Sequence, residues 1–366
     1  MRVHVVDPPA YTPPYDHALC AALARAGAEA TLVTAAGAEP PIGAYAVAEA
    51  FYRRVPGRPG SRLRRLGRLA RHGPDLVRYG RSARGVDVVH WQWLPVQALD
   101  ALLLPGIRPR LLTAHDVLPR EAAPLQRAGQ RRLYARMDAV VVHSEHGARR
   151  LAGEAGVDPA RVHVIPHGVL DHLARVPTGP LPAELAGTEG PVVLCFGLIR
   201  PYKGVDVLVE AWRRLAPAAE LWIVGRPRMD VAALRARSPA SVRWLTRWTA
   251  PGELAALFRR ADLVVLPYRE IDQSGVLFTA LAFGRPLLLT AVGGFPEVAR
   301  TGAAELVPPE DPDALAAALG GLLAAPERRA ALAAAARTAG APDGPYGWDG
   351  IARRTLDLYA RLRSQA

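Results

Sequence analysis

The sequence predicts an α/β protein made of two Rossmann-like domains, each a parallel sheet covered by helices. Short apolar segments alternate with helical patterns from residue 2 to residue 165, and the alternation starts again at residue 192. Strands of a parallel sheet are buried on both faces, so they appear as short continuous apolar runs. A chain of 366 residues, 50% hydrophobic and 22% charged, has room for two such domains and is not disordered as a whole.

The first half carries the pattern of six strands and five helices. Apolar runs predict strands at residues 2–6, 30–34, 86–91, 110–114, 139–143 and 162–165. Helical spacing of apolar residues predicts helices at residues 15–26, 62–71, 95–104, 125–137 and 145–155. We therefore expect residues 1–172 to form the first domain.

The second half repeats the pattern after a segment rich in Pro and Gly. Residues 173–190 are expected to be a linker. Strands are predicted at 192–196, 220–224, 242–245, 263–266 and 286–290, and helices at 205–215, 252–260, 275–283 and 313–323. Residues 191–345 then form the second domain, and 346–366 a final helix. Ligands of such sheets lie beyond the carboxyl ends of the strands, which predicts a cleft between the domains.

Several function classes lack their motifs in this chain. No Gly-rich dinucleotide fingerprint, Walker A lysine, H-E-x-x-H or G-x-S-x-G is present, and Cys20 and Cys195 match no zinc or disulfide pattern. The histidines at 143, 146, 163, 167 and 172 have no zinc-ligand spacing, so we expect no metal and no cofactor. No apolar run is long enough to span a membrane and the first residues are strand-like, so we expect a cytoplasmic protein, with peripheral contact at an anionic membrane left open.

The positive charge is concentrated in one segment. Of 46 basic residues all but Lys203 are arginine, and residues 53–84 hold eleven arginines against one acid, Asp75. Such local charge indicates an anionic partner at one face and argues against nucleic acid bound along the chain. In so arginine-rich a chain Lys203 marks a place where a compact ammonium is needed, although a leftover surface lysine is the alternative.

Three segments of the second half carry chemistry. Residues 192–204 (VVLCFGLIRPYKG) place cations directly after a strand, which suits a diphosphate. Residues 261–286 put Ser274 and Gly275 at the start of a helix, where backbone N–H groups point at an anion. Residues 292–298 (VGGFPEV) form a glycine turn before Glu297. Each segment also has an ordinary structural explanation, as a strand-to-helix loop, a serine cap or a turn.

In this order the three segments resemble glycosyltransferase family 4, retaining nucleotide-sugar transferases of the GT-B fold. Residues 197–204 match the family's G-R-L-x-x-x-K-G, and residues 271–286 match its E-x7-E with the following A-x-G-x-P. ADLVVLPY, VGGFPE and the IPHGV at 165–169 also fit, and the resemblance covers nearly the whole chain. It implies that the last helix crosses back to the first domain.

The resemblance implies a donor site in the second domain. Lys203 corresponds to the lysine that holds the donor diphosphate, and Arg200 assists because Leu198 replaces the family's arginine after Gly197. The paired glutamates of E-x7-E fall on Ile271 and Thr279, which places ribose recognition on another residue. The expected donor-binding residues are Gly197, Glu270, Asp272, Ser274, Gly275, Val276 and Thr279, with Glu297 as a further contact or a plain loop residue.

The acceptor side is expected in the first domain. His115, just after a strand, corresponds to a histidine that faces the transferred sugar, so the expected catalytic residues are His115, Lys203 and Arg200. A Pro-rich loop with two tyrosines replaces the family's Gly-rich loop after the first strand, and predicts a distinct acceptor pocket. The acceptor-side residues are Tyr11, Tyr15, Asp16, His90, Trp91 and Asp116, with Trp93 beside them.

The expected function is metal-independent transfer of a hexose-type sugar, with retention, from a nucleotide-diphosphate sugar to an anionic acceptor. A small molecule of natural-product biosynthesis and a lipid-linked cell-envelope intermediate are both open. A GT-B epimerase is one alternative; a phosphorylase would need pyridoxal phosphate on Lys203. A third is an adaptor at an anionic membrane, because Leu63, Leu66 and Leu69 form an apolar stripe among the arginines of residues 53–84. That stripe is alternatively a solvated face, or part of an acceptor site.

Overall fold

The computed structural model describes residues 1–58, 60–118 and 124–365, and these fold into two compact units. The first unit combines Met1–Gly168 with the C-terminal segment from Trp348, and the second is Val169–Gly347. In the described residues no helix is long and apolar enough to cross a membrane.

The first unit contains a seven-stranded sheet in the order β3-β2-β1-β4-β5-β6-β7, and every pair is parallel. Its strands are β1 (Arg2–Asp7), β2 (Glu29–Ala35), β3 (Ala46–Phe51), β4 (Val88–Trp91), β5 (Arg110–Thr113), β6 (Ala139–Val142) and β7 (Val162–Val164). The chain moves outward from β1 in both directions, so the loops after β1 and β4 meet at the same edge.

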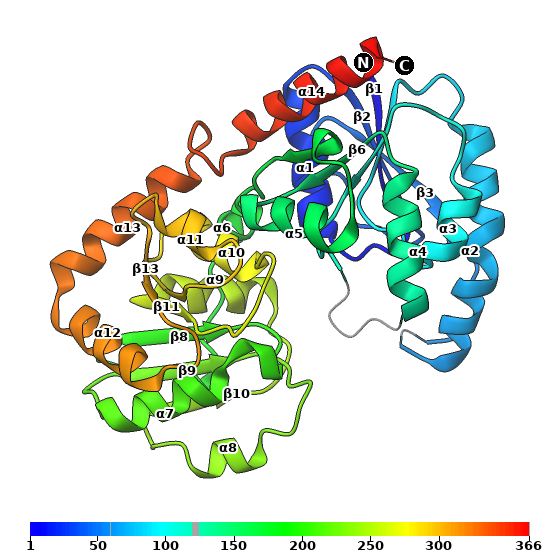
Figure 1. Ribbon diagram of the computed structural model, residues 1–366. Coiled ribbons are helices and arrows are strands. Elements are labelled where there is room, and N and C mark those ends of the chain that lie inside the picture. Colours follow the sequence, from blue (N-terminus) through cyan, green and yellow to red (C-terminus); the bar gives the residue numbers. More distant parts are fainter. Residues whose placement is uncertain (59, 119–123, 366) are drawn as a thin grey trace. The chain divides into compact units, whose positions relative to one another are not determined.

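Helices cover both faces of this sheet. They are α1 (Pro13–Arg25), α2 (Arg62–Ser82), α3 (Gln97–Leu103), α4 (Pro124–Ala135), α5 (Glu145–Ala155) and α14 (Trp348–Ser364), with a 3-10 turn η1 (Pro159–Arg161). Successive strand residues point to opposite faces, so Val5 packs with α1 and α14 while Val6 packs with α2 to α5. Figure 1 shows α14 beside α1, so the last helix belongs to the first unit, as expected from the sequence.

The second unit contains a six-stranded parallel sheet in the order β10-β9-β8-β11-β12-β13. Its strands are β8 (Val192–Phe196), β9 (Glu220–Val224), β10 (Val242–Leu245), β11 (Leu263–Leu266), β12 (Leu287–Thr290) and β13 (Ala304–Val307). Its helices are α6 (Asp171–Arg175), α7 (Val205–Leu215), α8 (Ala232–Ala236), α9 (Pro251–Arg260), α10 (Gly275–Ala282), α11 (Phe295–Ala299), α12 (Pro312–Ala324) and α13 (Pro326–Gly340), with 3-10 turns η2 (Ala183–Leu185) and η3 (Pro201–Lys203).

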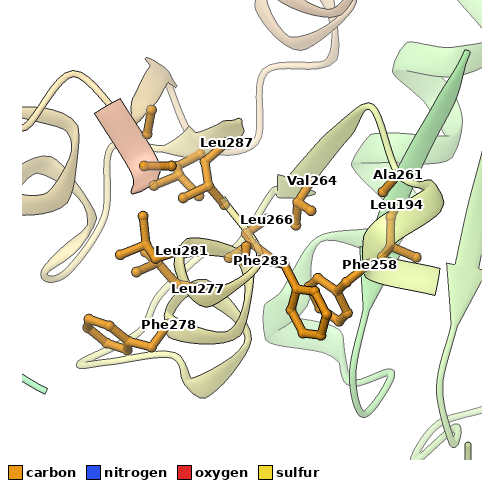
Figure 2. Packing of buried hydrophobic residues seen from close by; sticks show 14 of the residues in the cluster. Leu194, Phe258, Ala261, Val264, Leu266, Leu277, Phe278, Leu281, Phe283 and Leu287 are labelled. Carbon is orange, nitrogen blue, oxygen red and sulfur yellow. The ribbon is translucent and has the colours of Figure 1, made fainter. Parts of the chain in front are cut away.

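One side of this sheet is closed by aromatic packing against α9 and α10. Leu194 of β8 and Leu266 of β11 are fully buried with Phe258 and Phe278 (Figure 2). The rings of Phe258 and Phe283 stack with centroids 5.3 Å apart. This packing fixes α10 against the sheet, and its first residue, Gly275, therefore has a defined place at the carboxyl edge of β11.

The fold class predicted from the sequence is confirmed, and individual elements differ. The segment 173–190, expected to be a linker, lies within the second unit because Leu185 is fully buried and Leu173 and Leu181 pack on the core. Strands β3 and β13 and helices α6, α8, α11 and α13 were not predicted. Strand β3 and helix α13 are rich in alanine, which gives a weak apolar pattern, and the other elements are only four or five residues long. Helix α2, expected to end at residue 71, continues through Pro74 to Ser82.

Tyr359 attaches α14 to the centre of the first sheet. It is fully buried, and its hydroxyl lies 2.6 Å from Nδ1 of His90 on β4. We predict that Tyr359→Phe lowers the free energy of unfolding by about 1–3 kcal/mol, because His90 then loses a buried hydrogen-bond partner. Urea unfolding measures this, with Arg353→Ala on the exposed side of α14 as the control. Equal stability of Tyr359→Phe and the wild type would contradict this structural role.

Candidate functional site

A cation site lies at the carboxyl edge of the second sheet. Gly197 directly follows β8 with a φ of +108°, and a Cβ there would lie 2.9 Å from Nζ of Lys203 and 3.1 Å from Val276. A side chain at position 197 would therefore push the lysine away from the start of α10. The structure thus brings together Gly197, Lys203 and Val276, three residues that the sequence assigns to one donor site.

Lys203 is a buried cation whose contact is a tyrosine. It is 7% exposed, and its Nζ donates a hydrogen bond of 2.8 Å to the hydroxyl of Tyr268 and lies 4.8 Å from that ring's centroid. Burial alone would lower the pKa of Lys203, but the interactions with Tyr268 outweigh it and the pKa is raised. No carboxylate of the described residues forms an ion pair with Lys203, so a buried positive charge is left for an anion to neutralise.

The start of α10 faces the same group of side chains. Ser274 precedes the helix, is buried, and makes no side-chain hydrogen bond to the first turn; its hydroxyl lies 3.4 Å from that of Tyr268. Gly275 is exposed, so a ligand can approach the backbone closely. A helix N-terminus that lies beside a cation with no carboxylate partner is suited to bind a phosphate group. Tyr268 was not predicted as a site residue; its signals in the sequence are its place at the end of the ADLVVLPY segment and two residues after β11.

The other residues predicted for the donor differ in how accessible they are. Thr279 is buried, and its hydroxyl donates to the backbone oxygen of Gly275 at 2.9 Å, so it is directed at its own helix. Asp272 is buried, whereas Glu270 and Arg200 are exposed. A Cβ on Gly293 would lie 1.7 Å from the backbone oxygen of Ile271, so the loop before α10 packs directly against the glycine turn that precedes Glu297 on α11.

In the first unit, His115 lies at the wall of a pocket of about 260 Å³. Its ring stacks on Trp93 with centroids 5.3 Å apart, its Nε2 lies 3.0 Å from Oε1 of Gln92, and its Nδ1 lies 3.3 Å from Nε2 of His143. We call this the His115 pocket; its wall also includes Tyr11, Asp116, Gln126, Gln130 and Tyr134. Gln92 was not predicted, and its buried Nε2 has no hydrogen-bond partner among the described residues.

Tyr15 and Asp16 lie behind the wall of this pocket. Tyr15 is buried and its ring contacts His115, His143, His167 and Trp348. Burial lowers the pKa of His143 to about 4 and that of His167 to about 3, and it lowers the pKa of His115 as well. His115 is therefore a neutral imidazole at pH 7.

Asp16 positions the Pro-rich loop from the interior. The Oδ2 atom of Asp7 accepts hydrogen bonds from the amides of Tyr11 (2.7 Å) and Thr12 (3.1 Å), and the Thr12 hydroxyl donates to Asp16 (3.3 Å). Burial and the neighbouring Asp7 raise the pKa of Asp16, because two close carboxylates cannot both be charged. Tyr11, at the tip, is 59% exposed and packs edge-on against Trp93.

His90 and Trp91 are interior residues, and their predicted place on the acceptor side is corrected. Both ring nitrogens of His90 are engaged, Nδ1 with Tyr359 and Nε2 with the Thr113 hydroxyl at 2.8 Å. Trp91 is 1% exposed and packs edge-on against Tyr79. Strand β4 is buried on both faces of the sheet, so its last residues point into the two cores, and Trp93, two residues later, reaches the pocket.

The described residues contain no group of three or more His, Cys, Asp or Glu placed to hold a metal ion. The ring of His143 contacts the rings of His115 and His167, and all three histidines contact the ring of Tyr15. Metal-independent chemistry remains a prediction for this chain.

Comparison with known families and proteins gives consistent matches. Residues 15–171 match the family described as Glycosyltransferase Family 4, and residues 190–325 match Glycosyl transferases group 1. A D-inositol 3-phosphate glycosyltransferase of Xylanimonas cellulosilytica is 31% identical over 94% of this chain and 89% of its own length. The protein of that name from Segniliparus rotundus is 33% identical over 77% of this chain and 63% of its own.

Solved structures share the fold at low sequence identity. HepE of Anabaena in complex with UDP has a TM-score of 0.74 and 19% identity, covering 99% of this chain and 100% of its own. Sucrose-phosphate synthase of Thermosynechococcus elongatus has a TM-score of 0.74 and 21% identity, and the match covers 100% of this chain and 99% of its own.

The buried histidines predict that stability depends on pH. In the folded protein their pKa values lie below the value of about 6.5 in the unfolded chain. Their contribution to the free energy of unfolding is therefore complete above pH 6.5 and is lost as the pH falls toward about 4. Urea unfolding measures the free energy of unfolding at both pH values. Between pH 7 and pH 5 we expect it to fall by about 1 kcal/mol per pH unit for each such histidine. His143→Gln is expected to reduce this dependence on pH. Equal stability at both pH values would show that these rings are not held neutral.

Proposed function

The chain belongs to glycosyltransferase family 4 and is a glycosyltransferase, and we propose that it moves a hexose-type sugar from a nucleotide-diphosphate sugar to an anionic acceptor. The observation that carries the proposal is Lys203, buried beside the start of α10 and paired with no carboxylate of the described residues. The leaving group of such a donor is a nucleoside diphosphate, an anion of the kind this site suits.

The donor is proposed to place its diphosphate between Lys203 and the backbone amides of Gly275 and Val276. Negative charge develops on the leaving diphosphate as the sugar–oxygen bond breaks, and charges already in position stabilise it without reorganisation. This supports catalysis without a metal ion, with Arg200 assisting from the exposed side. Structures of HepE with UDP and with UDP-glucose share the fold and support a donor of the UDP-sugar type.

Ribose recognition is proposed to shift from the helix to the loop before it. The hydroxyl of Thr279, where the family's second glutamate would be, is directed at its own helix. Asp272 and Glu270 lie in the loop that packs on the Gly293 turn, next to the helix start. We propose one of these carboxylates as the sugar-hydroxyl contact, because carboxylate oxygens accept strong hydrogen bonds from hydroxyl groups.

The acceptor is proposed to bind in the His115 pocket of the first unit. The side-chain amide of Gln92 is held against His115, and Tyr11 and Asp116 are accessible at the wall. The neutral His115 ring is proposed to face the transferred sugar, with its orientation fixed by Gln92 and His143, which occupy its two ring nitrogens. No side chain is proposed as a nucleophile, so retention follows from attack on the face from which the diphosphate leaves. Relatives named D-inositol 3-phosphate glycosyltransferase support an anionic acceptor.

Epimerase activity is the main alternative, since a Listeria monocytogenes protein assigned as a UDP-N-acetylglucosamine 2-epimerase shares the fold, with a TM-score of 0.64 and 17% identity. An epimerase consumes UDP-N-acetylglucosamine without an acceptor, whereas a transferase releases nucleoside diphosphate in proportion to the acceptor glycosylated. Product analysis with and without acceptor separates the two, and a β-linked product from an α-linked donor would contradict retention.

Lys203→Ala is predicted to reduce kcat about 10²- to 10³-fold, the usual cost of removing one preorganised charge donor from an active site. Turnover is measured by release of nucleoside diphosphate. Arg235→Ala, an exposed charge on α8, is the matched control and is expected to retain wild-type turnover. Near-normal turnover of a folded Lys203→Ala enzyme would refute the diphosphate role of this residue.

A further inference from the structure

A second pocket of the first unit, of about 190 Å³, carries two arginines of α2. We call it the arginine pocket; its wall includes Pro9, Tyr11, Tyr52, Arg65, Arg68 and Leu69. The guanidinium of Arg68 donates to the backbone oxygen of Pro9 at 2.9 Å and lies 4.4 Å from the centroid of the Tyr52 ring. Arg68 is therefore held in a fixed place, while Arg65 on the preceding turn is exposed.

Two acids near Tyr52 have other partners. Asp75 pairs with Arg78 at 2.8 Å, and Asp100 pairs with His72 at 2.5 Å. Among the residues that the structure describes, no carboxylate forms an ion pair with Arg65 or Arg68. The pocket is thus a concave surface with two positive charges that no acid of the described chain neutralises, which favours an anionic ligand.

A buried hydrogen-bonded chain holds the floor of the pocket in place. The Tyr52 hydroxyl lies 2.7 Å from Nδ1 of His72, whose Nε2 contacts Asp100. Tyr52 has a φ of +56°, a conformation that is strained for tyrosine, and its amide donates to Asp75 at 2.8 Å. Strained residues persist where the surroundings over-determine them, often at ligand sites. This network positions the Tyr52 ring under Arg68.

The arginine pocket adjoins the His115 pocket. Tyr11 and Pro95 line both. One ligand can therefore lie in the His115 pocket and extend past Tyr11 to the arginines.

We propose that the arginine pocket binds a phosphate ester group carried by the acceptor, with Arg65 and Arg68 as its ligands. The proposal rests on the acceptor side lying in the first unit, as proposed above. Guanidinium groups bind phosphate oxygens in bidentate geometry, and Arg68 is already oriented by Tyr52 and Pro9. Arg65 and Arg68 thereby select acceptors that carry such a group over their neutral counterparts.

The phosphate ester can belong to a soluble molecule or to a lipid headgroup. Leu63, Leu66 and Leu69 are 59%, 56% and 53% exposed on the same helix, so an apolar stripe runs beside the arginines. Both sources present the same chemistry to Arg65 and Arg68, and the experiment separates them.

The test measures anion binding directly, without donor or turnover. Every variant is made in the full-length Lys203→Ala background, so that the anion site of the second unit does not contribute. Inorganic phosphate is titrated at constant ionic strength and followed by thermal unfolding. Flotation with vesicles of phosphatidylglycerol and phosphatidylcholine in equal parts, compared with phosphatidylcholine alone, tests the lipid source. The variants are Arg65→Gln, the double variant Arg65→Gln/Arg68→Gln, and Arg81→Gln as an exposed control on the same helix.

The double variant is expected to raise the half-saturating phosphate concentration about tenfold or more, the effect of losing about 1.4 kcal/mol of binding free energy. Arg65→Gln, which leaves the Arg68 contacts intact, gives a smaller rise, and Arg81→Gln gives none. If the double variant loses phosphate binding alone, the phosphate ester belongs to a soluble acceptor. If it loses phosphatidylglycerol-dependent flotation, the phosphate ester belongs to a lipid headgroup.

The proposal is overturned if phosphate binding and vesicle flotation respond to Arg65 and Arg68 no more than to Arg81. It is also overturned if neither probe binds. Because the assay omits the nucleotide, failure of the donor assignment at Lys203 leaves its result unaffected.

Discussion

The burial of Lys203 constrains the geometry of the second unit. A buried ammonium is costly unless a hydrogen bond or an opposite charge compensates it, and within the described part of the chain Tyr268 compensates it through a hydrogen bond and its ring face. The lysine reaches this place because Gly197 has no side chain and because α10 is fixed by Phe278 and its neighbours in the core. The catalytic proposal thus depends on an arrangement in which a loop, a helix start and a tyrosine keep one positive charge ready for an incoming anion.

The first unit uses its polar residues differently. His115, His143 and His167 are held neutral by burial, which lowers the pKa of each, and the Pro-rich loop is tied to Asp7 and Asp16 from inside the protein. These groups create two adjoining pockets with a common wall at Tyr11, one with neutral polar groups around His115 and one with arginines. The uneven charge along the sequence thereby has a local consequence: two arginines of the basic segment line a pocket, and the others spread over α2 and the loops on either side of it.

The sequence predicted the fold well because alternating apolar and helical segments are a local signal. It also grouped Gly197, Lys203 and Val276 correctly, since the order of loops at a parallel sheet edge follows from the motif. It could not distinguish His90 from His115, because both follow or end a strand and their accessibility depends on tertiary contacts such as Tyr359. Tyr268, Gln92 and the Tyr52–His72–Asp100 chain were beyond sequence reasoning for the same reason: their partners lie far away in the chain.

The central claim is that Lys203 holds the diphosphate of a nucleotide donor, and ligand binding without turnover tests it most directly. Thermal unfolding of the wild type and of Lys203→Ala is measured with UDP, GDP, ADP, TDP and CDP in turn. The account predicts that at least one nucleotide stabilises the wild type, by about 2.7 kcal/mol at a concentration of about 100 times its Kd, and that Lys203→Ala loses most of this effect. Stabilisation by none of the five, or equal stabilisation of both proteins, would contradict it.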